Sequence, residues 1–311
     1  MAAVTAAMVK ELRESTGAGM MDCKKALTAT DGNMDEAVEF LRKNGQAKAE
    51  KKAGRIAAEG LCRVVTDGDK KAAVVEVNSE TDFVAKNEKF QSFVEAVADQ
   101  AIKSDAKDMD AFMKEAWNKD TSKTVQEALV EEIAVIGEKL TIRRFNKVET
   151  DGCVVTYLHG GGRIGVIVEA DTDVINDEIK ECLTNVAMQV AALSPQYVTR
   201  DEIDAEYIEH EKGILREQIN NDPKESQKPD KVKEGMIAGR INKELKEICL
   251  VDQIYVKAED GKQSVGKYVD SVAKANGAKL SIKRFVRYET GEGLEKKNED
   301  FAAEVASQMG N

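Results

Sequence analysis

Residues 60–82 read "GLCRVVTDGDKKAAVVEVNSETD", and this stretch sets the pattern for most of the chain. Two apolar runs flank the turn "DGDK", which predicts two antiparallel strands joined by a tight connection. An acidic turn ending in Thr81 and Asp82 follows. Apolar residues then recur at helical spacing, at Phe90, Val94, Val97 and Ala101. The stretch therefore predicts a hairpin followed by a helix.

The same arrangement occurs a second time. Residues 153–173 read "CVVTYLHGGGRIGVIVEADTD", and a helical pattern follows at Ile179, Leu183, Val186 and Val190. Each copy closes with nearly the same strand, "KLTIRRF" at 139–145 and "KLSIKRF" at 279–285. Two copies of a hairpin–helix–strand unit predict an α+β core of two related subdomains with small antiparallel sheets. We place them at 56–148 and at 149–198 with 250–290.

The second copy is interrupted by the charged segment 199–249. It reads as two long helices around "NNDPKESQKPD", with Pro223 and Pro229 at the tip because proline disfavours helix interiors. We expect an inserted helical hairpin that projects outward. Its narrow apolar stripe needs cover, so we also expect contact with a neighbour, which includes a homodimer through 199–249.

Helices are also predicted at both ends of the chain. Residues 1–55 read as a three-helix domain and a basic linker, with a capping box at Asn33 and Glu36 and an end to the third helix at Gly45. Residues 291–311 carry Phe301, Val305 and Met309 at helical spacing, which predicts a C-terminal amphipathic helix.

The composition of the chain argues against several classes of function. The 311 residues are 42% hydrophobic and 33% charged, with a net charge of -11, which is typical of a globular chain and disfavours direct nucleic-acid binding. The five cysteines form no Cys-x-x-Cys pair, and the N-terminus lacks an apolar signal core. No apolar run approaches the ~20 residues of a membrane span. We therefore expect a cytoplasmic protein without a membrane partner.

Three motif matches are treated as accidental. "HGGGRIG" at 159–165 fits a dinucleotide fingerprint, but its glycines join two strands rather than open a helix. The same loop resembles an esterase oxyanion loop, yet the chain has no Gly-x-Ser-x-Gly nucleophile. "GKQSVGKY" at 261–268 has Tyr268 where a phosphate-binding loop needs Ser or Thr. With only two histidines and no nucleophile–base pair, we expect no metal, no cofactor and no enzyme.

The residue after Thr81-Asp82 raises a separate question. If Thr81-Asp82 aligns with Thr172-Asp173, Phe83 in the first copy aligns with Val174 in the second. The spacing of Ser79 and Asp82 predicts a capping box, which would put Phe83 in the first turn of a helix. An exposed aromatic there suits a binding hot spot. The alternative, that Phe83 packs into the core, stays open.

Four motifs carry a resemblance to a known family. "ELRESTGAGMMDCKKAL" at 11–27 and "TDFVAKN" at 81–87 are similar to the two signatures of the translation elongation factor Ts family. "HGGGRIGV" at 159–166 resembles another family motif with one extra glycine, and "GEGLEKKNEDFAAEV" at 291–305 resembles the C-terminal module. The resemblance covers nearly the whole chain and is weak only in the middle of 199–249.

The resemblance implies a fold and a function. It implies that the N-terminal domain is like ubiquitin-associated (UBA) domains. It implies a guanine nucleotide exchange factor for elongation factor Tu, which promotes GDP release without making or breaking a bond. The family's Asp-Phe pair enters the G domain near the magnesium and phosphate site, and Asp82 and Phe83 match it.

The resemblance also implies further contacts with elongation factor Tu. Thr81 and Val84 flank the Asp-Phe pair. The other matching positions are Arg13, Met20, Met21, Lys24, Ile136, Gly137 and His159. The competing interpretation is a UBA-like binding adaptor without exchange activity.

Overall fold

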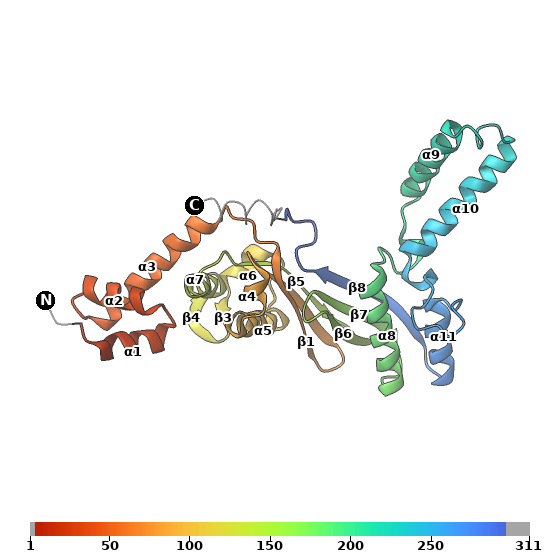
Figure 1. Ribbon diagram of the computed structural model, residues 1–311. Coiled ribbons are helices and arrows are strands. Elements are labelled where there is room, and N and C mark those ends of the chain that lie inside the picture. The colour runs from red at the N-terminus through yellow and green to blue at the C-terminus, as the bar shows by residue number, and fades with distance from the viewer. Residues whose placement is uncertain (1–3, 297–311) are drawn as a thin grey trace.

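Two three-stranded antiparallel sheets form the centre of the molecule (Figure 1). The computed structural model describes residues 4–296. The first sheet has the order β1-β2-β5, with β1 at Glu59–Asp67, β2 at Lys71–Ser79 and β5 at Thr141–Glu149. The second has the order β6-β7-β8, with β6 at Cys153–His159, β7 at Ile164–Thr172 and β8 at Leu280–Glu289. The predicted α+β class with small antiparallel sheets is confirmed.

The two sheets pack against each other, and β2 is buried on both faces. Successive side chains of a strand point to opposite sides. On β2, Ala73 and Val75 pack against the helix that follows, whereas Ala72 and Val74 pack against Ile167 of the second sheet. Because neither face meets water, the strand needs no polar alternation, which explains the continuous apolar run.

A glycine permits the close approach of the sheets. Gly165 lies on β7, and a Cβ atom there would be 3.0 Å from Val74 Cγ2 and 3.2 Å from Cys62 Cβ. These distances are tighter than most real contacts, so a larger side chain would push the sheets apart. The glycine that completed the dinucleotide fingerprint is therefore a packing residue.

Helices cover the outer faces of the sheets. α5 at Glu88–Lys103 follows the first hairpin, and α8 at Asp177–Leu193 follows the second. Each begins at an asparagine whose side chain accepts backbone hydrogen bonds, Asn87 for α5 and Asn176 for α8. Both copies therefore start their helix with the same cap.

Each copy holds a second helix that the sequence reading missed. In the first copy it is α7 at Val125–Ile136, preceded by α6 at Met109–Lys114 and a short hairpin of β3 at Ala116–Trp117 and β4 at Asp120–Thr124. In the second copy it is α11 at Val265–Ala275. The repeated unit is therefore hairpin, helix, second helix and strand.

The N-terminal helices are α1 at Ala6–Thr16, α2 at Met20–Ala29 and α3 at Met34–Lys52. The predicted end of the third helix at Gly45 is wrong, because α3 runs on through most of the basic linker. Gly45 is buried against α7, and a Cβ atom there would lie 3.5 Å from Ala134 Cβ. The predicted capping box is half formed, since Asn33 caps α3 but Glu36 accepts from the Asn33 side chain.

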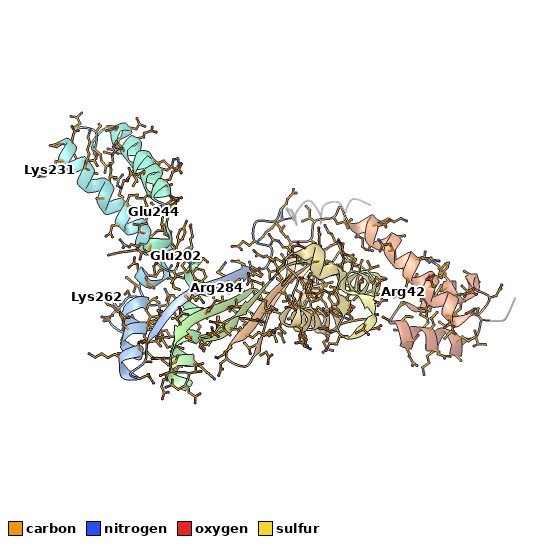
Figure 2. All side chains as sticks on the ribbon, turned by 180° about the vertical axis from the view of Figure 1, so that it is seen from behind. Arg42, Glu202, Lys231, Glu244, Lys262 and Arg284 are labelled. Carbon is orange, nitrogen blue, oxygen red and sulfur yellow. The ribbon has the colours of Figure 1, made fainter. Side chains whose placement is uncertain are left out.

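The segment 199–249 forms a helical arm that projects from the second subdomain (Figure 1). Its helices are α9 at Ala205–Asn221 and α10 at Asp230–Ile248, and two short 3₁₀ turns, η1 at Arg200–Glu202 and η2 at Leu250–Asp252, flank them. In Figure 2, Lys231 and Glu244 mark the arm, and Arg42 marks α3 at the opposite end of the molecule. The inserted hairpin is present as predicted.

The arm covers most of its own apolar stripe. Ile219 is fully buried and Ile237 is 2% exposed, and both belong to one cluster made by the two helices. The Tyr207 hydroxyl also donates to Glu244 Oε1 across the pair at 2.8 Å. Most of the stripe that suggested a neighbour is thus filled within the hairpin, whereas Ile214 and Val232 stay exposed. A homodimer through 199–249 stays a prediction, and only this small remainder of the stripe supports it.

Two further predictions concern membrane-spanning segments and the C-terminal helix. Within residues 4–296, no helix combines the length and apolarity that a membrane span needs. The predicted C-terminal helix with Phe301, Val305 and Met309 lies outside the described residues.

Candidate functional site

Phe83 lies on α4, a single helical turn at Asp82–Ala85 between β2 and α5. The turn is capped by Thr81, whose Oγ1 accepts from the backbone N–H of Val84. The predicted capping box at Ser79 and Asp82 is wrong, because the Ser79 hydroxyl instead donates to the carbonyl of Thr81 at 3.0 Å. The Phe83 side chain is 78% exposed, so the alternative of a core position is also wrong.

One neighbour anchors α4 and another flanks the ring. Val84 is half-buried and packs against the core of the first subdomain. Lys86 Nζ contacts Asp82 Oδ2 at 2.6 Å and lies 5.9 Å from the centre of the Phe83 ring. The hydrogen bond from Lys86 lowers the pKa of Asp82, so this carboxyl group is charged at neutral pH. The site therefore presents an aromatic ring beside an ion pair.

The hydrogen bonds of the two copies correct the alignment of their turns. Thr172 donates its hydroxyl to the carbonyl two residues ahead, and Ser79 does the same in the first copy. The carboxylate of the next residue, Glu80 or Asp173, accepts the backbone N–H of the lysine just before the last strand, at 2.6 and 2.7 Å. Ser79-Glu80 therefore corresponds to Thr172-Asp173, and the alignment of Thr81-Asp82 with that pair is wrong.

The corrected alignment makes α4 an insertion. Seven positions separate Glu80 from the cap of α5 at Asn87, whereas three separate Asp173 from the cap of α8 at Asn176. The difference equals the four residues of α4. Phe83 has no counterpart in the second copy, and the comparison with Val174 does not apply.

The N-terminal site residues lie on α1 and α2, and the connection between these two helices contacts α7. Met20 and Met21 are 58% and 62% exposed at the start of α2, and Arg13 and Lys24 are exposed as well. The α1–α2 connection contacts the core, since a Cβ atom on Gly17 would lie 3.9 Å from Val135 Cγ2.

Ile136 and Gly137 follow Val135 directly. Gly137 ends α7 in a left-handed conformation with φ at 85°. Ile136 and Gly137 therefore lie next to Val135, the residue of α7 that faces the α1–α2 connection.

His159 comes from the second subdomain. It is exposed at the end of β6, and its Nδ1 atom lies 3.0 Å from the Tyr157 hydroxyl. The turn after it reaches the first sheet, where the backbone N–H of Cys62 donates to the Gly162 carbonyl at 2.7 Å. The His159 turn thus contacts β1, the strand that pairs with β2 just before α4.

Glu138 was missed by the sequence reading. It accepts three hydrogen bonds from Glu80 and Thr81, the two residues before α4. The repeat could have pointed to Glu138, because "GEKL" at 137–140 aligns with "GAKL" at 277–280. The acidic residue occurs only in the copy that carries α4.

Metal ligands are not grouped at this surface. Among residues 4–296, no set of three or more His, Cys, Asp or Glu side chains is arranged to hold a metal ion. The candidate site residues lie on α1, α2 and α4 and at the ends of α7 and β6. Most of them are exposed apolar or charged side chains, which suits a protein-binding surface.

Comparison with known proteins assigns the family. The family described as "Elongation factor TS" matches residues 80–292. The chain is 51% identical to "Elongation factor Ts" of Clostridioides difficile (strain 630) over 310 residues, covering 99% of this chain and 100% of the relative. It is 48% identical to the protein of the same name from Trichlorobacter lovleyi over 314 residues, covering 99% of each. These relatives are translation elongation factors of a family of nucleotide exchange factors. The chain belongs to the elongation factor Ts family.

Proposed function

We propose that the chain is the guanine nucleotide exchange factor of elongation factor Tu and that Asp82 and Phe83 enter the G domain near its magnesium and phosphate site. The observation that carries this proposal is the inserted turn, which presents Phe83 at 78% exposure. An insertion found in one copy of a repeat is not needed to form the repeat's fold. Its aromatic side chain is therefore available for a partner.

Energetics require further contacts around Phe83. A GTPase that binds GDP with nanomolar affinity gains about 12 kcal/mol, and a thousandfold faster release needs a shift of about 4 kcal/mol. Burying one phenylalanine contributes only ~1.5–3 kcal/mol. We assign the remaining contacts to Thr81, Val84, Arg13, Met20, Met21, Lys24, Ile136, Gly137 and His159.

We infer that the parts of the chain share this work. The three N-terminal helices form a UBA-like domain at 1–55. This domain and the C-terminal module at 291–311 both bind the G domain. The two core subdomains, at 56–148 and at 149–198 with 250–290, carry Phe83 and His159 respectively. The exposed methionines of α2 support the first of these roles.

GDP and magnesium are expected to weaken the complex with elongation factor Tu. Coupling between two ligands is reciprocal, so GDP must lower the affinity for this chain by the factor by which this chain lowers the affinity for GDP. Titration calorimetry at rising GDP concentrations measures that factor. An affinity independent of GDP would identify a binding adaptor instead of an exchange factor.

Replacing 199–249 with a short Gly/Ser loop is expected to leave a folded protein with substantial exchange activity. The ends of the arm are already joined, since the N–H of Leu250 donates to the Tyr197 carbonyl at 2.9 Å and that of Val251 to the Val198 carbonyl at 3.1 Å. Thermal melting and GDP release are the measurements. An unfolded product would place the arm in the core, and a folded but inactive one would place it in the partner contact.

A further inference from the structure

We propose that Glu138 is a positioning residue that holds the turn bearing Phe83, and that exchange activity depends on this contact. The inference rests on the proposed function, because it assigns a role to Glu138 through Phe83. Glu138 follows Gly137, just after α7, and its side chain is half-buried.

The contact is a carboxylate that accepts from two successive backbone groups and a hydroxyl. Glu138 Oε2 accepts from the N–H of Glu80 at 3.1 Å and from the N–H of Thr81 at 3.0 Å. Glu138 Oε1 accepts from the Thr81 hydroxyl at 2.7 Å. Hydrogen bonds to a charged acceptor are about twice as strong as neutral ones. Glu138 therefore fixes the backbone at the point where α4 begins.

The same turn is held from the other direction. The N–H of Lys139 donates to Glu80 Oε1 at 2.6 Å, and Arg55 contacts that carboxylate at 3.2 Å. Hydrogen bonds thus run in both directions between the pair Glu138-Lys139 and the pair Glu80-Thr81. Thr81 then uses its hydroxyl oxygen to cap α4.

The second copy separates the role of Glu138 from the needs of the fold. There, Lys279 donates to Asp173 just as Lys139 donates to Glu80. The position of Glu138, however, is taken by Ala278, which has no side-chain acceptor. The second copy also lacks α4. The lysine contact therefore belongs to the repeated fold, whereas the glutamate contact goes with the inserted turn.

Rigidity at this root matters because Phe83 is exposed. A ring that has to enter a partner loses less conformational entropy if its backbone is already fixed. Two contacts hold α4. The side chain of Val84, within α4, packs on the core, and Glu138 binds the residues immediately before α4. Loss of Glu138 should leave the sheet intact and let the orientation of α4 vary.

The first experiment needs no partner. Glu138→Ala in the full chain is expected to speed amide hydrogen exchange at Glu80 and Thr81 by about tenfold or more, because both N–H groups lose their acceptor. Glu138→Gln retains one accepting oxygen and should show a smaller increase. Asp173→Ala, the matched control, should affect the amide of Lys279 and not those of Glu80 and Thr81. Unchanged exchange at Glu80 and Thr81 in Glu138→Ala would overturn the positioning role.

The second experiment measures GDP release from elongation factor Tu. Glu138→Ala is expected to slow release about threefold or more, but to add nothing in a Phe83→Ala background, because effects that act through one contact are not additive. Equal slowing in both backgrounds would overturn the inference by giving Glu138 a contact of its own. If Phe83→Ala itself releases GDP normally, the proposed function fails at Phe83, and the amide measurement alone decides whether Glu138 holds the turn.

Discussion

Replacing Phe83 with alanine is expected to slow the GDP release that the chain promotes from elongation factor Tu at least about tenfold. A factor of ten corresponds to about 1.4 kcal/mol, which is slightly less than the ~1.5–3 kcal/mol that burial of a phenylalanine in a partner can supply. The free protein should melt at an unchanged temperature, because the ring is 78% exposed and contributes little to the core. Stopped-flow release of fluorescent GDP and thermal melting are the two measurements.

Val232→Ala provides a matched control for Phe83→Ala. Val232 is also an exposed apolar side chain, at 46%, but it lies on α10 in the arm. Its loss should change neither GDP release nor the melting temperature. Normal release with Phe83→Ala would refute the role of the ring. A lower melting temperature would show that Phe83 supports the fold instead.

Replacing Glu76 with glutamine is expected to cost about 3 kcal/mol of folding stability. Glu76 is fully buried and accepts from the guanidinium groups of Arg143 and Arg144 and from the backbone N–H of Gly291 at 2.8 Å. Glutamine removes the charge, which leaves Arg143 without its carboxylate partner and Arg144 with Glu292 alone. Breaking a buried ion pair costs ~3–5 kcal/mol. We take the lower end because the arginines are partly exposed. Denaturant unfolding at neutral pH measures the loss.

Glu169 is the internal control for Glu76. It occupies the same place in the second sheet, where it faces Arg284 on the neighbouring strand as Glu76 faces Arg144. Its partners Lys283 and Arg284 are about half exposed, so water can compensate them. Glu169→Gln should therefore cost only about 1 kcal/mol. Equal losses in the two variants would contradict the assignment of a stronger buried cluster to Glu76.

The Glu76 cluster also predicts a pH dependence. Burial alone would raise the pKa of Glu76, but hydrogen bonds from Gly291 and Asn78 and the charge of Arg144 outweigh it, so the pKa lies below its ordinary value of 4.5. A lowered pKa stabilises the fold at pH above the unfolded value, and this contribution is lost as pH falls through the folded value. The stability difference between wild type and Glu76→Gln should thus shrink below about pH 4.5. A constant difference would contradict it.

Apolar runs predicted the core strands, because β2 is buried on both faces and so needs no polar alternation. The apolar run at 72–77 and its repeat around β7 gave both hairpins, and the helical spacing after each gave α5 and α8. The insertion of α4 could not be read in this way. Sequence identity aligned Thr81-Asp82 with Thr172-Asp173. In the structure, Glu80 is equivalent to Asp173, because both carboxylates accept the N–H of the corresponding lysine although the two residue types differ.

Other errors arose where tertiary contacts override local signals. Gly45 is a helix-ending residue by propensity, but in α3 it lies against α7, where the absence of a side chain permits close packing. The turn that carries Phe83 also makes a long-range contact that local signals do not show, because Thr81 donates to Glu138, 57 residues away in sequence. In the arm, the apolar stripe was predicted correctly, but most of it is covered by packing between the two helices of the arm rather than by a neighbour.

The most direct test of the account is the rate at which fluorescent GDP leaves elongation factor Tu as this chain is added. If the chain is an exchange factor that acts through Phe83, release should accelerate about a thousandfold at saturation, equivalent to about 4 kcal/mol, and Phe83→Ala should remove at least a factor of ten. A tight complex that leaves the release rate unchanged would contradict the account and identify the chain as a binding adaptor.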